Sequence, residues 1–183
     1  MPISQLDPAA ALVLIDLQKG VIGLPTAHSS AAIVADAARL ARAFRRRNLP
    51  VVLVNVVARA PGRTSVSLSF TPPPDWHELS PELGAEPQDI RVTKYNVGAF
   101  HGTSLDLQLR RRGVTQIFLG GIATSSGVEA TARAGYDHGY NIVAVTDAMT
   151  DMDAESHDHA VRKQFPKIGE TTTVAEVLSF LGG

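Results

Sequence analysis

The sequence has no cysteine among its 183 residues. This absence excludes disulfides, thiolate metal sites and any thiol nucleophile. Aromatic residues make up only 5% of the chain and form no evident array for binding a substrate. The net charge of −1 gives no electrostatic reason to expect nucleic acid or an anionic membrane as a partner. No apolar run approaches the length of a membrane span and no secretory segment precedes the first predicted strand, so we expect a cytoplasmic protein.

Ordinary globular composition, with 44% hydrophobic and 19% charged residues, favours one domain spanning residues 1–183. Apolar runs predict strands, and helical periodicity predicts helices between them. The strands are expected at 10–15, 50–57, 89–93, 117–119, 141–146 and 171–174, and the helices at 29–47, 103–112, 124–139, 153–165 and 176–181. This alternation predicts a three-layer α/β fold with a mostly parallel sheet.

Polar residues stand where several of these strands end: Asp16, Lys94 and the turn at 121–127. Ligands of parallel sheets bind beyond the carboxyl ends of the strands, so we expect these features to share one site. The turn leads from a strand into a helix, and the hydroxyl residues at 124–126 are expected to cap that helix. Its backbone N–H groups suit a carbonyl oxygen, a carboxylate or an oxyanion. The same pattern, in which two glycines and a serine lie between a strand and a helix, also occurs in ordinary α/β crossovers that have no functional site.

The segment 58–88 is irregular and rich in proline. A loop of this length inside a compact domain is expected to be either a lid or an oligomer contact. Trp76, the only tryptophan, is interpreted either as loop packing or as a substrate contact. The arginine runs at 45–47 and 110–112 end predicted helices, where cations complement the helix dipole.

Three stretches of the chain together resemble the isochorismatase-like superfamily, also called cysteine hydrolases. They are ALVLIDLQKG around Asp16, RVTKYNVGAF around Lys94 and GGIATSSGVEATARAGYDHGY from Gly120. The resemblance runs over nearly the whole chain. It implies a sheet of about six parallel strands with helices on both faces, a homo-oligomer (dimer or larger), and a non-proline cis peptide at Ile122-Ala123.

The chain departs from the amidases of that family at Gly127, where they place the nucleophilic cysteine. Their acyl-enzyme route therefore does not carry over. Ser126 precedes that position by one residue, and one residue along a helix turns the side chain by about 100°. We therefore expect Ser126 to cap the helix and not to act as the nucleophile. The Asp-x-His zinc ligands of nicotinamidases are missing after the second strand. His157 and His159, two apart in a predicted helix, face different sides, so we expect neither a metal nor another cofactor.

True isochorismatases also lack the thiol, and the resemblance suggests Asp16 as the general acid that protonates an enol ether carbon. Lys94 and Gly127 complete the expected catalytic set. Lys94 holding one substrate carboxylate, and Arg59 doing likewise from the loop after the second strand, would fit a dianionic substrate. An intimate Asp16–Lys94 ion pair would oppose the acid role, unless a bound anion takes over the lysine. The substrate-binding residues that we expect are Arg59, Phe100, Ile122, Ala123, Thr124 and Ser126.

The sequence thus predicts an isochorismatase-like hydrolase that acts without a covalent cysteine intermediate. Its expected partner is a small carboxylated substrate, with isochorismate or a related enol ether as the concrete candidate. Two alternatives stay open. One is a member that has lost catalysis and serves as a ligand-binding protein or scaffold. The other is an amidase that uses water, Ser125 or Ser126.

Overall fold

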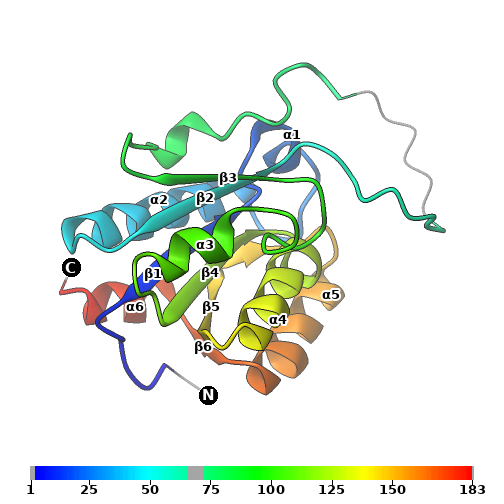
Figure 1. The fold of residues 1–183 in the computed structure, drawn as a ribbon. Helices are drawn as coiled ribbons and strands as arrows, with labels where there is room; N and C mark the ends of the chain where they lie inside the picture. The colour runs from blue at the N-terminus through cyan, green and yellow to red at the C-terminus, as the bar shows by residue number, and fades with distance from the viewer. Residues whose placement is uncertain (1–2, 66–71, 183) are drawn as a thin grey trace.

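A computed structural model describes residues 3–65 and 72–182 of the chain. Six parallel strands form one sheet in the order β3-β2-β1-β4-β5-β6. Figure 1 shows this sheet running through the middle of the molecule. The strands are β1 (Ala10–Ile15), β2 (Val51–Val56), β3 (Ile90–Lys94), β4 (Gln116–Ile122), β5 (Asn141–Thr150) and β6 (Glu170–Thr172). The fold and the parallel sheet predicted from the alternation of strands and helices are confirmed.

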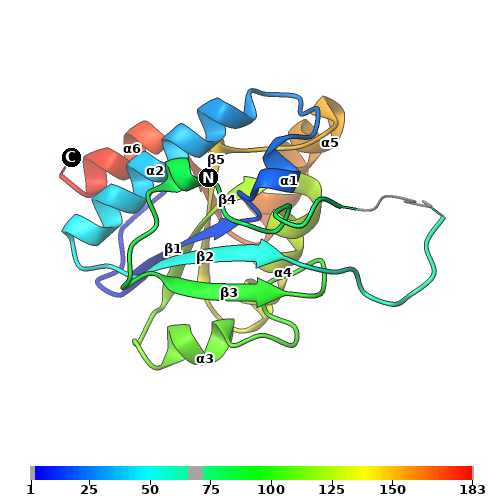
Figure 2. The same ribbon diagram turned by 90° about the horizontal axis from the view of Figure 1, so that it is seen from above.

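Helices cover both faces of the sheet, as the resemblance implied. The long helix α2 (Ser30–Arg46) and α6 (Val174–Phe180) pack on one face, while α3 (Leu105–Arg110) and α4 (Glu129–Asp137) pack on the other (Figure 2). The short helices α1 (Lys19–Ile22) and α5 (Ala154–His159) lie near the carboxyl ends of the strands. Strands β1 and β4 are buried throughout, because they lie between these two layers.

Several boundaries differ from the sequence prediction. Strand β5 continues to Thr150, four residues beyond its expected end, because a register shift against β4 lets it resume pairing at Met149. Asp147 therefore lies within the strand and accepts a hydrogen bond from the Val174 N–H, instead of marking the strand end. Helix α6 begins at Val174 with Thr173 as its cap, two residues before the expected start.

The described part of the long loop packs against α1. Leu79 forms an antiparallel bridge with Gln18, and the Gly20 N–H donates to the Trp76 carbonyl over 2.8 Å. A Cβ atom on Gly20 would lie 2.8 Å from the Trp76 Cβ, so the tryptophan and α1 are in close contact. This placement supports loop packing for Trp76. Among the described residues, no helix is long and apolar enough to cross a membrane.

The arginine runs make contacts within the chain. Arg45 forms a buried ion pair with Asp89 at 2.7 Å, which joins the end of α2 to the start of β3. Arg47 donates to the Leu181 carbonyl, and Arg112 donates to the Gln108 carbonyl and side chain. These contacts agree with a structural role for both runs.

Candidate active site

Asp16 and Lys94 come from separate strand ends and meet at the carboxyl edge of the sheet. Asp16 directly follows β1 and adopts a left-handed backbone conformation with φ of 53°. Its N–H donates to the Val54 carbonyl of β2 over 2.9 Å, which fixes the turn out of the strand. Lys94 is the last residue of β3, on the far side of β2. Its long side chain allows the ammonium to reach across the end of the intervening strand.

The two side chains form a buried ion pair. Lys94 Nζ lies 2.7 Å from Asp16 Oδ2, and only 2% of the lysine and 5% of the aspartate are exposed. Lys94 Nζ also donates to the carbonyl of Val97 at 2.9 Å and to that of Asn96 at 3.3 Å. An ammonium has three N–H groups, and these three acceptors use them all.

The other carboxylate oxygen of Asp16 has a different environment. Oδ1 is the single buried side-chain polar atom in the described ranges that has no hydrogen-bond partner. Burial raises the pKa of Asp16 to about 6, although the neighbouring Lys94 ammonium acts in the opposite direction. A carboxyl with a pKa near neutrality and one unsatisfied oxygen is suited to carry and donate a proton.

Gly127 lies in the turn Thr124–Val128, which follows β4 and leads into α4. A Cβ atom on Gly127 would lie 3.3 Å from Asp16 Oδ2 and 3.1 Å from Ile15 Cγ2. A side chain at this position would therefore contact the ion pair directly. The peptide bond Ile122-Ala123, just before the turn, is cis, as the resemblance implied.

Asp151 and His157 form hydrogen-bond contacts with this turn. Neither residue was expected at the site from the sequence. Asp151 Oδ2 accepts hydrogen bonds from Ser125 N at 2.7 Å and Ser125 Oγ at 2.8 Å. His157 Nδ1 lies 2.8 Å from Thr124 Oγ1. The expected capping by the hydroxyls of residues 124–126 is wrong: the residue that precedes the turn is Ala123, and no side chain of the turn caps it. The apolar residues 148–149 before Asp151 were the available signal that the strand continues to this point.

A cavity of about 480 Å³ opens above the ion pair. Of the nine predicted site residues, seven line it: Asp16, Arg59, Lys94, Ile122, Ala123, Ser126 and Gly127. They come from four separate segments of the chain, which the fold brings to one place. Val21, Val56, Val97 and Met152 add apolar side chains, and Asp151 also lies in the lining.

The remaining two predicted site residues lie elsewhere. Phe100 is a core residue whose ring stacks on His138 at 5.1 Å and Tyr140 at 5.8 Å between centroids, so its expected substrate contact is not supported. It is the last residue of the RVTKYNVGAF motif, at the point where the chain enters the core and an apolar ring is expected. Thr124 is fully buried behind the turn and contacts His157 instead of the cavity.

The histidines of α5 have separate environments, as their spacing predicted. His157 is buried against Thr124, and burial together with the nearby His28 imidazole lowers its pKa. His159 is exposed, and its Nε2 contacts Gln164. Within the described residues, no group of three or more His, Cys, Asp or Glu side chains could hold a metal ion.

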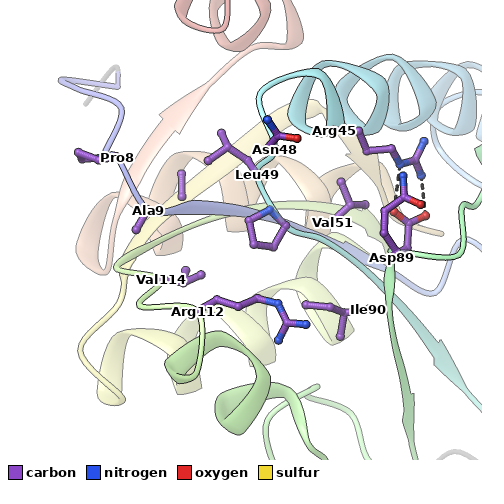
Figure 3. A pocket seen from close by; sticks show the side chains of 13 residues that line it. Pro8, Ala9, Arg45, Asn48, Leu49, Val51, Asp89, Ile90, Arg112 and Val114 are labelled. Atoms are coloured by element: carbon purple, nitrogen blue, oxygen red, sulfur yellow. Dashed lines mark hydrogen bonds and ion pairs between the residues drawn. The ribbon is translucent and has the colours of Figure 1, made fainter.

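A second hollow, of about 540 Å³, lies at the opposite edge of the sheet, beside the amino ends of the strands (Figure 3). The Arg45 guanidinium is directed at Asp89 there, and the two charges pair with each other. Ligands of parallel sheets favour the carboxyl edge. The cavity beside Asp16 is therefore the better candidate for an active site.

The sheet is all-parallel, and a buried carboxyl, an ammonium and a turn that leads into a helix meet at its carboxyl edge, so the protein is of the α/β class with a candidate site at that edge. A model of the isochorismatase domain matches residues 10–176. The chain belongs to the isochorismatase family. It is 42% identical over 176 residues to the uncharacterized isochorismatase family protein YwoC of Bacillus subtilis, covering 92% of each chain.

Solved structures agree with this assignment. An isochorismatase family protein from Burkholderia thailandensis is 43% identical, with a TM-score of 0.88 over 98% of both chains. A cysteine hydrolase from Pseudomonas syringae has a TM-score of 0.84 at 24% identity, covering 99% of this chain and 96% of its own, which shows the shared fold.

Proposed function

We propose that the protein is a hydrolase that cleaves a small carboxylated enol ether without a covalent enzyme intermediate, with Asp16 as the general acid. The observation that carries the proposal is the state of Asp16. Asp16 lines the cavity, its Oδ1 is buried without a hydrogen-bond partner, and its pKa is raised to about 6. A group with such a pKa is protonated in a useful fraction of molecules near neutral pH.

The close contact with Lys94 does not remove this capacity. The ammonium binds Oδ2, which leaves Oδ1 as the oxygen available to carry the proton. Desolvation outweighs the attraction of the lysine in setting the direction of the pKa shift. After the proton leaves, the same ammonium stabilises the carboxylate that forms.

The proposed reaction begins with transfer of the proton from Asp16 Oδ1 to the terminal carbon of the enol ether. The C=C electron pair forms the new C–H bond, and the ether carbon becomes an oxocarbenium ion. Water adds to that carbon and returns a proton to Asp16. The resulting hemiketal breaks the C–O bond to the original ether oxygen while its new O–H electron pair forms the C=O bond, and the hydroxyl proton passes to the departing oxygen, which gives a keto acid and an alcohol. No atom at position 127 takes part, which is compatible with glycine there.

Two alternatives remain proposals of lesser support. Asp151 accepts hydrogen bonds from both the N–H and the hydroxyl of Ser125, an arrangement that supports a structural role for this serine. Ser126 lines the cavity, so an amidase that uses its hydroxyl or water is the second enzymatic candidate. A member that binds ligand without turnover is the third.

The homo-oligomer and the cytoplasmic location expected from the sequence also remain proposals.

Pyruvate release from isochorismate and from simpler enol ethers tests the leading proposal. Asp16→Asn keeps the shape of the side chain and removes the transferable proton, so its rate should fall by about 100-fold or more. Asp36→Asn, on α2 and paired with Arg39 away from the cavity, is the matched control and should keep the full rate. Equal rates for Asp16→Asn and the wild type would refute the proposal that Asp16 is the general acid. Labelling of Ser126 by a phosphonate would instead favour the amidase.

A further inference from the structure

The lysine of the ion pair has no free donor for a substrate. Its three N–H groups are taken by Asp16 Oδ2 at 2.7 Å, Val97 O at 2.9 Å and Asn96 O at 3.3 Å. Two of these acceptors are backbone carbonyls of the segment directly after β3, so they do not move away as a side chain can. Binding of a carboxylate by Lys94, which the sequence suggested, would require at least one of these bonds to break.

Arg59 is the other cation in the cavity lining, and it is available. Its guanidinium donates to Thr64 Oγ1 over a long 3.4 Å, and none of the described carboxylates forms an ion pair with it. The residue is exposed at the cavity mouth. A guanidinium has five N–H donors in a fixed fork that matches a carboxylate, so most of its donors remain for a ligand.

The acidic groups of the cavity oppose a second anion. Asp151 Oδ2 accepts two hydrogen bonds from Ser125, and Asp151 Oδ1 accepts one from Met152 N, so its charge is held in place. When Asp16 carries its proton, Lys94, Arg59 and Asp151 leave the lining with one net positive charge. One carboxylate on the ligand neutralises it. A second carboxylate would face Asp151 and Asp16 with no free cation, at the cost of an unpaired charge.

We infer that this cavity selects a substrate with a single carboxylate, which Arg59 binds, and that it discriminates against dicarboxylates such as isochorismate. The inference rests on the proposed active site, and it narrows the substrate class within the proposed reaction. Arg59 is then the residue that determines specificity, while Lys94 binds Asp16 and does not bind the substrate.

A matched pair of enol ethers tests this selectivity. One compound is 2-(cyclohexyloxy)acrylate, and the other has the same scaffold with a second carboxylate on the ring. We expect kcat/KM to be at least about tenfold higher for the monocarboxylate, since a buried unpaired charge costs more than 1.4 kcal/mol, the equivalent of a tenfold change. Arg59→Gln should lower kcat/KM for the monocarboxylate by about 10- to 100-fold, the range expected for a lost charge-assisted hydrogen bond.

Arg63→Gln is the matched control, because Arg63 is an exposed arginine of the same loop outside the cavity lining. It should leave both kcat/KM values unchanged, and Arg59→Lys should keep part of the rate. Equal kcat/KM values for the two compounds would overturn the inference while leaving the proposed reaction intact. So would equal effects of Arg59→Gln and Arg63→Gln.

A binding measurement separates this inference from the proposed reaction. Calorimetric titration should show that pyruvate, a monocarboxylate, binds the wild type about tenfold or more tighter than malonate, a dicarboxylate, with the preference lost in Arg59→Gln. That result without turnover of any enol ether would refute the proposed reaction and support the single-carboxylate preference. Binding of malonate as tight as that of pyruvate, or no binding of either, would overturn the preference.

Discussion

His157 Nδ1 lies 2.8 Å from the hydroxyl of Thr124, and this contact ties helix α5 to the turn that forms one wall of the cavity. Both residues are buried. The Ser125 N–H and hydroxyl also donate to Asp151. These contacts attach the first two residues of the turn to the segment 151–157, which follows β5. Gly127 belongs to the same turn and lies beside Asp16.

Replacement of Thr124 by valine should destabilise the protein. The change keeps the shape but leaves His157 Nδ1 buried without a partner, which costs about 1–3 kcal/mol. Urea unfolding measures the loss. Thr93→Val is the control, because the Thr93 hydroxyl is exposed and bonds only to Asn55, and it should change stability by less than about 0.5 kcal/mol. Equal stability of the two variants would contradict the structural role of the contact.

The pKa of His157 is lowered from its usual 6.5, first by burial and then by His28. The unfolded chain therefore binds this proton more readily than the folded protein, and stability should be lost as the pH falls below about 6.5. His157→Phe removes this contribution. The free energy of unfolding should fall more for the wild type than for the variant between about pH 8 and about pH 5. Parallel curves for the two proteins would show that His157 is not responsible.

Lys94 lowers the pKa of Asp16, and burial raises it. If Asp16 must be protonated to act, kcat/KM should fall about tenfold per pH unit above about 6. Lys94→Met keeps the length of the side chain and removes its charge, so this falling limb should move to higher pH even if the maximal rate declines. The pH profile of pyruvate release measures the shift. A limb that stays in place, or moves to lower pH, would argue against titration of Asp16.

Gly121 should tolerate no side chain. Its φ is +121°, and a Cβ atom there would lie 2.1 Å from the Ile15 carbonyl oxygen, which is a backbone atom of β1 and cannot move aside. We expect Gly121→Ala to yield little folded protein. Gly84→Ala is the control, since Gly84 also has a positive φ, of +56°, but has open space around it. Its cost should be about 1 kcal/mol. Circular dichroism and thermal unfolding of both variants compare the two.

Gly127→Cys should place a thiol in the cavity beside the ion pair. The new Cβ atom would lie 3.1 Å from Ile15 Cγ2, so the neighbours need to shift only by a few tenths of an ångström. The Asp16 carboxylate, whose Oδ2 would lie 3.3 Å from the new Cβ atom, disfavours a thiolate, so iodoacetamide should modify this thiol more slowly than an ordinary exposed thiol. Gly62→Cys, where nothing lies within 4 Å of the new Cβ atom, supplies that exposed reference. Modification of Gly127→Cys as fast as that of the reference would contradict the placement of position 127 beside Asp16.

The sequence predicted the sheet because most of its buried parallel strands read as apolar runs, which is a strong local signal. An Asp at a strand end is a weak signal by itself, and Asp16 and Lys94 were expected to share a site because each stands at the carboxyl end of a predicted strand. The expected end of β5 at residue 146 leaves Asp151 outside the predicted site. The apolar residues 148–149 indicate a longer strand, but the polar residues 146–147 interrupt the pattern, and the register shift against β4 depends on pairing between strands.

The error at Phe100 has a similar cause. A motif shows that its residues are close to the site in sequence, but not which side of the sheet each one faces. Val97 lines the cavity, whereas Phe100, three residues later, packs in the core against Tyr140. Arg59 lines the cavity because it stands shortly after β2 and the carboxyl ends of parallel strands share one edge, while its role in substrate binding stays a prediction.

The unequal environments of the two Asp16 oxygens bear on the stereochemistry of the proposed reaction. Since Lys94 holds Oδ2, any proton that Asp16 donates leaves from Oδ1 and arrives from a fixed direction. A bound enol ether with two different substituents on its terminal carbon would then be protonated on one face, and the keto acid formed in deuterium oxide would be a single enantiomer at that carbon.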